Sequence, residues 1–228
     1  DRGVNNIEAL KNLNGIRRQR VLGVYKQWLY ENNDYHKVCD FMQKINFCVQ
    51  DLNEELKIID KLESKDIVYI VSLVDWIKDA YEMIEKCIGG KILNNFRFKK
   101  EEELKQVKDF FTAIRSFIVA HPSSTNRHGK FGLDGDFICT DIDIKIKPFL
   151  ELLPEKTYYT LSINGIENKK TKCDFYLQSY SEKADKMRFM KFIGCNLNDI
   201  YLVACLYIEK LYELDKYLVK NIKRKDYV

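Results

Sequence analysis

Histidine is the side chain best suited to transfer a proton at neutral pH, and the sequence holds three, His36, His121 and His128. His36 stands at an expected helix start, which favours a capping or solvent-exposed role. His121 follows Arg115 by six positions, and Pro122 comes directly after it. An arginine fork binds phosphate oxygens and an imidazole moves a proton. The Arg115–His121 pair therefore suits phosphodiester chemistry.

This pair can share one face only if its helix ends at the histidine. In an unbroken α-helix, six residues rotate the chain by about 600°, which leaves the two side chains about 120° apart. Proline disfavours the α conformation in the residue before it. We therefore expect the helix to end at His121, whose side chain can then swing toward the face that carries Arg115. The simpler alternative is a capping or buried histidine near a surface arginine.

The spacing resembles the R-x4-6-H motif of the HEPN superfamily, small helical bundles that are often ribonucleases in toxin–antitoxin, CRISPR and phage-defence systems. Five residues separate Arg115 from His121, and an Ala-His pair ends the helix as in that family. Ser116 stands where the family usually has Asn, Asp or His. The resemblance covers the motif and the surrounding helices.

The resemblance implies a metal-independent endoribonuclease that needs no cofactor. Two copies of the chain would bring two Arg115–His121 pairs into one cleft. His121 would assist attack of the RNA 2′-hydroxyl on its own phosphate, and Arg115 would stabilise the charge of the transition state. The products would be a 2′,3′-cyclic phosphate and a 5′-hydroxyl.

The loop after His121 holds the candidate substrate-binding residues. Asn126, Arg127 and His128, together with Ser116, offer hydrogen-bonding groups for a second phosphate or for a base. The alternative interpretation is an ordinary surface loop that satisfies its own hydrogen bonds.

The sequence predicts no metal site. Asp134, Asp136, Asp141 and Asp143 form two D-x-D pairs, and the second pair would share one side of a strand. Solvated turn and edge-strand charges explain these carboxylates more simply. The seven cysteines contain no CxxC pair, which indicates reduced thiols in a cytoplasmic protein.

Composition is compatible with RNA binding but does not require it. The net charge is +4, and basic runs occur at residues 17–20, 99–100, 169–172 and 220–225. No apolar run reaches about 18 residues, so no membrane span is expected. The chain has no P-loop, GxGxxG, GxSxG or HExxH motif, which argues against nucleotide kinases, Rossmann enzymes, α/β-hydrolases and zincins.

Apolar periodicity predicts a mainly α fold. Helical spacing is found at residues 5–30, 35–59, 67–88, 99–120 and from about 196 into the basic tail. Strand-like alternation is found at residues 137–146, 157–163 and 173–180, with a hairpin tip expected between the last two. We therefore expect one domain over residues 1–228, a bundle of about five helices with a small β insertion at 137–180, between the fourth and last helices.

Two functions follow from these observations. The first is a metal-independent endoribonuclease that acts on RNA as a cytoplasmic homodimer, with an antitoxin or another protein as a candidate partner. The rival is a non-catalytic helical module that contacts protein or nucleotide. Ser116, in place of the family's commoner residues, favours the rival.

Overall fold

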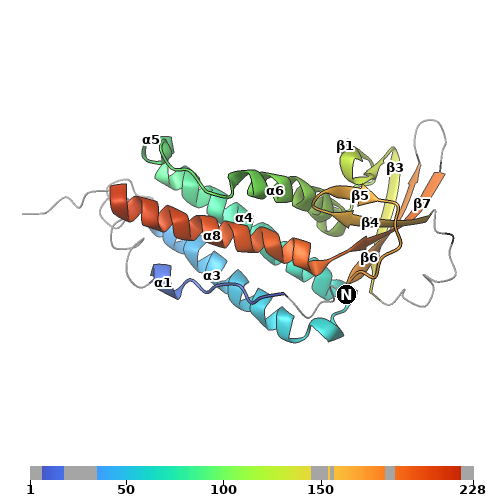
Figure 1. Ribbon diagram of the computed structural model, residues 1–228, viewed down its shortest axis with the longest axis horizontal. Coiled ribbons are helices and arrows are strands. Elements are labelled where there is room, and N and C mark those ends of the chain that lie inside the picture. The colour runs from blue at the N-terminus through green and yellow to red at the C-terminus, as the bar shows by residue number, and fades with distance from the viewer. Residues whose placement is uncertain (1–6, 18–34, 145–153, 155–156, 183–187, 222–228) are drawn as a thin grey trace, which may run out of the picture. The chain divides into compact units, whose positions relative to one another are not determined.

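A computed structural model of the chain describes residues 7–17, 35–144, 154, 157–182 and 188–221 (Figure 1). The chain divides into two compact units. The sheet unit comprises Asp1–Glu8, Glu55–Ser72 and Lys105–Val203, and the helical unit comprises Ala9–Glu54, Leu73–Leu104 and Ala204–Val228. The boundary between the two units falls inside four long helices, whose bounds are given next. Each of these helices therefore contributes residues to both units.

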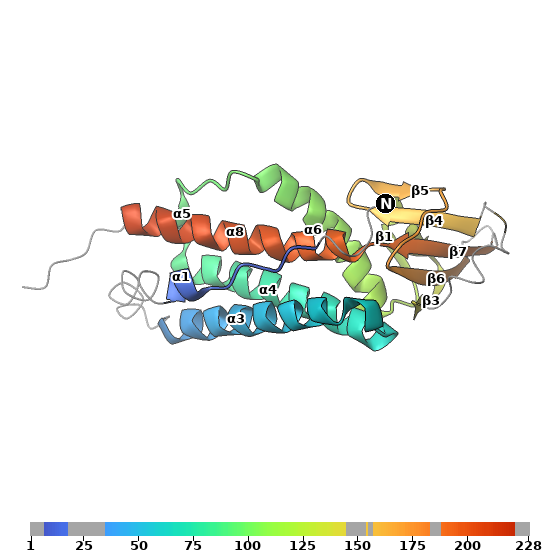
Figure 2. The same ribbon diagram turned by 60° about the horizontal axis from the view of Figure 1, so that its bottom comes forward.

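The long helices lie close to their predicted ranges. They are α3 (Tyr35–Lys57), α4 (Ser64–Ile88), α6 (Glu101–Arg115) and α8 (Leu197–Asn221), and the short α5 spans Gly90–Leu93. In the helical unit, α3, α4 and α8 run side by side in both views (Figures 1 and 2). Buried Leu52, Ile77 and Leu211 come from the apolar stripes that predicted these helices.

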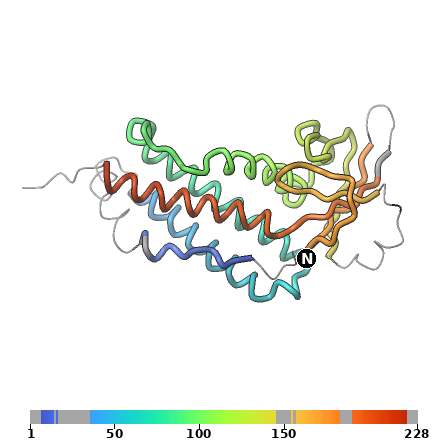
Figure 3. Tube along the Cα trace, viewed as in Figure 1, coloured from blue at the N-terminus to red at the C-terminus, as the bar shows by residue number. Residues whose placement is uncertain are grey.

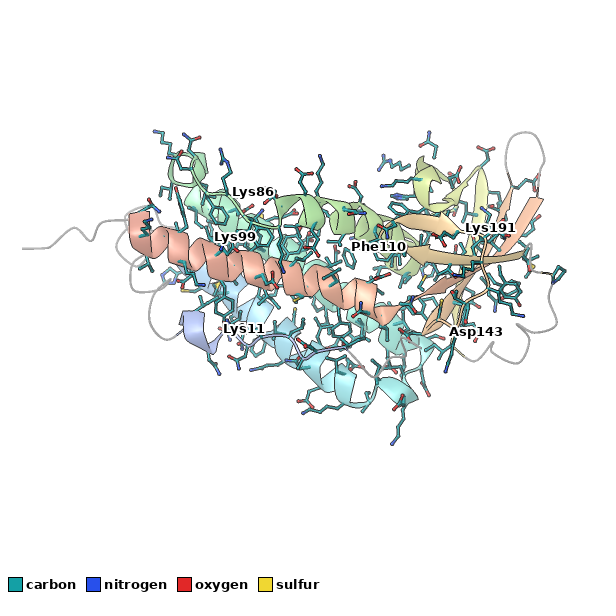
Figure 4. All side chains as sticks on the ribbon, viewed as in Figure 1. Lys11, Lys86, Lys99, Phe110, Asp143 and Lys191 are labelled. Atoms are coloured by element: carbon teal, nitrogen blue, oxygen red, sulfur yellow. The ribbon has the colours of Figure 1, made fainter. Side chains whose placement is uncertain are left out.

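The predicted first helix is wrong over residues 7–13. Residues 7–13 are not helical, and α1 (Asn14–Arg17) is the helical part within the predicted range; residues 5–6 and 18–30 of the predicted helix lie outside the described residues. Asn53 of α3 instead holds this segment, because its Oδ1 accepts from Leu10 N at 2.7 Å and its Nδ2 donates to Leu10 O at 3.0 Å. The Lys11 Nζ lies 3.7 Å from the ring centre of Tyr212 on α8 (Figure 4 labels Lys11). The segment at Leu10 and Lys11 is thus held by contacts with side chains of α3 and α8, and it does not form the helix that apolar periodicity predicted.

The β structure is much larger than the predicted insertion. Seven strands lie within the described residues: β1 (Thr125–His128), β2 (Leu133–Gly135), β3 (Phe137–Asp143), β4 (Tyr158–Ser162), β5 (Gly165–Glu167), β6 (Phe175–Glu182) and β7 (Arg188–Cys195). The first two form an antiparallel hairpin, and the other five form one mixed sheet in the order β3-β6-β7-β4-β5 (Figure 2). Only the β4–β7 pair in this sheet is parallel.

The expectation of a mainly α bundle with a small insertion at 137–180 is therefore wrong. The strand-bearing segment runs from Thr125 to Cys195 and builds a five-stranded sheet of its own. The hairpin expected between β4 and β6 is also wrong, because β4 pairs with β5 and β7 while β6 lies between β3 and β7. Short polar strands such as β1 are held by backbone hydrogen bonds and carry no apolar alternation. The sequence pattern therefore gives no signal for them.

The centre of the sheet is closely packed where β6 and β7 meet. Tyr158, Cys173, Tyr176 and Phe192 form a buried cluster. Gly194 of β7 lies opposite Tyr176, and a Cβ added to this glycine would stand 2.5 Å from the Cys173 sulfur. Because Gly194 has no side chain, the Cys173 thiol can pack directly against its backbone.

We predict that Gly194→Ala lowers the free energy of unfolding by about 1–3 kcal/mol, because the new methyl group overpacks this cluster. Cys173→Ala in the same chain should recover part of the loss, since it removes the nearest atom. Gly90→Ala is the matched control, because a Cβ there meets no atom within 4 Å. Urea denaturation measures all four proteins, and an unchanged midpoint for Gly194→Ala would contradict the packing.

Candidate functional site

The helix that carries Arg115 ends in an unusual turn. After α6, residues Ser116–Ala120 form one turn of π-helix, η3, and His121 then adopts a left-handed conformation with φ 42° and ψ 64°. The predicted helix end before Pro122 is thus confirmed. π-helical turns are rare and occur frequently at functional sites. A left-handed residue other than glycine also costs about 1–3 kcal/mol, so the surrounding structure must hold it in place.

A hairpin follows this turn and lies against the sheet. Its corner is the short 3-10 helix η4 (Gly129–Phe131), between β1 and β2 (Figure 3). Phe131 packs edge-on against Phe110 of α6, with ring centres 6.2 Å apart. Lys191 of β7 donates to the Gly132 carbonyl at 3.2 Å; Phe110 and Lys191 are labelled in Figure 4. Gly132 has φ +66°, and a Cβ there would stand 2.8 Å from Ile166, so this corner requires glycine.

The π-turn and the hairpin line an open pocket of about 500 Å³. It is lined by Ser116, Pro122, Ser124, Thr125, Asn126, Arg127, His128, Gly135 and Asp136. This set contains all four residues that the sequence predicted to bind substrate. The lining is rich in hydroxyl, amide and charged groups, and it suits a polar ligand.

The predicted catalytic pair stands beside the pocket and does not line it. Ser116 and Pro122 line the pocket, and they are the chain neighbours of Arg115 and His121. Arg115 is half-buried, whereas the His121 side chain is exposed. The structure therefore brings the backbone of both residues to the pocket's edge.

His128 lies in the pocket itself and is partly buried. Its ring packs edge-on against Phe117 of η3, with ring centres 6.2 Å apart and an interplanar angle of 75°. Phe117 is fully buried, so it offers a fixed surface to the imidazole. Burial lowers the pKa of His128, and the neighbouring Arg127 charge lowers it further. Both effects favour a neutral imidazole at neutral pH.

Asp136 is a pocket residue that the sequence did not assign to substrate. Its backbone N donates to Glu182 O at 2.8 Å, which fixes the chain just beyond β2. Arg127 and Asn126 are exposed, and the Arg127 N donates to Thr125 Oγ1 at 3.2 Å. The pocket thus combines a guanidinium, a carboxylate, an amide and an imidazole.

The other candidates lie elsewhere. Asp141 is exposed, and Asp143 accepts from Gln178 Nε2 at 3.2 Å (Figure 4 labels Asp143). Among the described residues, no three histidine, cysteine or acidic side chains cluster in a way that could hold a metal ion. His36 is exposed on α3. All seven cysteines lie in the described ranges and none forms a disulfide there, and Cys139 is the exposed one.

The helical unit carries a second, more apolar depression of about 310 Å³ along α3 and α4. Phe47 and Trp76 line it and are about half exposed, at 54% and 43%. Lys44 lies 5.1 Å from the Trp76 ring centre. None of the helices in the described ranges has the length and apolar character needed to cross a membrane.

Comparison with protein-family models, with curated proteins and with solved structures finds no match for this chain. The resemblance to the HEPN superfamily therefore stays a prediction from the motif.

We predict that NMR titration places the pKa of His128 below the ordinary histidine value of about 6.5. Arg127→Ala should raise this pKa, because it removes a nearby positive charge. The value should stay below the ordinary one, since burial is the larger cause. Arg97→Ala is the matched control, because it removes an exposed guanidinium from the helical unit. A His128 pKa that does not respond to Arg127→Ala would contradict the assigned electrostatics.

Proposed function

We propose that the hairpin pocket binds the backbone of single-stranded RNA and that the chain cleaves this RNA without a metal ion. One observation carries the proposal: Ser116, Asn126, Arg127 and His128 line a single polar pocket. The pocket volume of about 500 Å³ falls within the range of about 300–1,000 Å³ that is usual for small-ligand sites. A nucleotide segment is a ligand of suitable size and polarity.

The pocket is lined by side chains that can bind the phosphate and the base of a nucleotide. The Arg127 guanidinium can bind two phosphate oxygens at once. The Asn126 amide can donate to and accept from the edge of an unpaired base, and the Asp136 carboxylate can accept from it, which is how single-stranded RNA is usually recognised. The Ser116 hydroxyl adds a donor from the π-turn. These roles support RNA over a purely anionic ligand, because Asp136 would repel a second phosphate.

Arg115 and His121 supply the proposed chemistry at the pocket's edge. Arg115 stabilises charge on the phosphate in the transition state, and His121 transfers a proton. The products are a 2′,3′-cyclic phosphate and a 5′-hydroxyl. The HEPN resemblance adds three further proposals: a homodimer, a cytoplasmic location, and a protein partner such as an antitoxin.

A non-catalytic binding module is the second candidate. The observation in its favour is that neither Arg115 nor His121 lines the pocket. Such a module would hold nucleotide or RNA through the same lining residues and leave it intact. The two candidates share a ligand and differ only in whether the bond breaks.

We predict that the protein cleaves single-stranded RNA in EDTA. Arg115→Ala and His121→Ala should each lower the rate by about 10²–10⁴-fold. His36→Ala is the matched control, because it removes an exposed histidine from α3 and should leave the rate unchanged. Melting temperatures of the four proteins separate a catalytic role from a structural one. Intact RNA with every preparation, at unchanged melting temperatures, would favour the binding module.

Binding alone provides a separate test of the pocket. RNA in which every 2′-hydroxyl is methylated cannot be cleaved, so its affinity reports binding without chemistry. Arg127→Ala should weaken this binding. It should also reduce the slope of log K against log salt concentration by the amount expected for about one lost phosphate contact. Arg97→Ala, on the helical unit, should change neither quantity. Equal binding by wild type and Arg127→Ala would remove the pocket from consideration as the RNA site.

A further inference from the structure

We propose that His128 is the general base of this site and that His121 is the general acid. The inference rests on the proposed RNA cleavage and divides its two proton transfers between two histidines. The HEPN-type motif alone assigns a single histidine, so this division comes from the pocket geometry. It predicts different defects for the two histidine variants.

Position is the first argument. All three histidines are described, and of them only His128 lines the pocket. The substrate's reacting 2′-hydroxyl must lie within hydrogen-bond reach of its base. A nucleotide held by Arg127 and Asn126 lies beside His128, because all three residues line the same pocket. His128 is therefore the histidine whose backbone position is closest to the bound sugar and phosphate.

Orientation is the second argument. The edge-on contact with Phe117, at 6.2 Å between ring centres, gives the His128 ring a fixed side against a fully buried residue. Phe117 belongs to η3, the same π-turn that brings Ser116 to the pocket. The turn therefore positions both the imidazole and a neighbouring hydroxyl.

Protonation state is the third argument. A general base must be neutral when substrate binds, and burial together with Arg127 lowers the pKa of His128. Arg127 and Asp136 are the charged groups that line the pocket with it, and Asp134 lies on β2 across the hairpin. His121 is exposed next to Pro122, which lines the pocket, so its side chain has room to reach a leaving group at the pocket's edge.

The reaction balances with these two groups. The 2′-hydroxyl gives its proton to His128, and its oxygen forms a bond to phosphorus. The bond from phosphorus to the 5′-oxygen breaks, and that oxygen takes a proton from His121. The chain is left with one proton more on His128 and one fewer on His121, and exchange with water restores both.

An RNA with sulfur in place of the 5′-bridging oxygen distinguishes a general acid from a general base. The substrates are two RNAs of one sequence, and in the second RNA sulfur replaces the 5′-bridging oxygen at the mapped cleavage site. Thiolate leaves without a proton, so this RNA needs a base but no acid. His121→Ala should cleave the oxygen RNA about 10²–10⁴-fold more slowly than wild type and the sulfur RNA at close to the wild-type rate. His128→Ala should be slow on both RNAs, and added imidazole should restore part of its activity.

The outcomes distinguish this inference from the proposed function. Wild-type rates for His128→Ala on both RNAs would overturn the inference and leave RNA cleavage standing. A His121→Ala defect that persists on the sulfur RNA would also overturn it, because His121 would then act before the leaving group departs. Absence of cleavage by the wild type would overturn the proposed function and this inference together. A wild-type melting temperature for His128→Ala shows that the variant is folded, so that its slow cleavage reports the loss of the imidazole.

Discussion

Pro122 sets the geometry on which the rest of the site depends. Its ring disfavours the α conformation in the preceding residue, and the helical segment formed by α6 and η3 ends at Ala120. His121 takes a left-handed conformation, which turns the chain sharply into the hairpin. Because the helix widens into a π-turn before this point, Ser116 and Phe117 reach the pocket and the His128 ring. One proline thus determines where the helix, the pocket and the hairpin meet.

The sheet keeps this corner in place. A hairpin of two short strands is marginal in water by itself. Here its corner contacts α6 through Phe131 and the sheet through the Lys191–Gly132 hydrogen bond. The five-stranded sheet is therefore more than an appendage to a helical protein, since β7 supplies the lysine that holds the pocket's hairpin. This role explains why the sheet and the site belong to one compact unit.

Sequence reasoning grouped four residues that line one pocket, but it was wrong about the fold. Residue types and turn signals near Pro122 act locally, so the helix end and the four lining residues could be read from spacing. The sheet depends on pairing between distant segments, and β4 meets β7 in parallel across more than 25 residues of chain. The pocket role of Asp136 was missed for the same reason, because the Asp136 N is bonded to Glu182 on β6. Asn53, which holds the segment at Leu10 out of a helix, likewise acts over a distance of 43 residues.

The residue at position 121 is itself informative. Glycine adopts the left-handed conformation without steric cost, and it is the usual residue where a helix ends in this way. Histidine at this position carries a strain of about 1–3 kcal/mol, which buried contacts of Phe117 and Ile118 must offset. A purely structural turn would gain stability from glycine. An exposed imidazole in a strained turn at the edge of a polar pocket supports the proposal that His121 transfers a proton there.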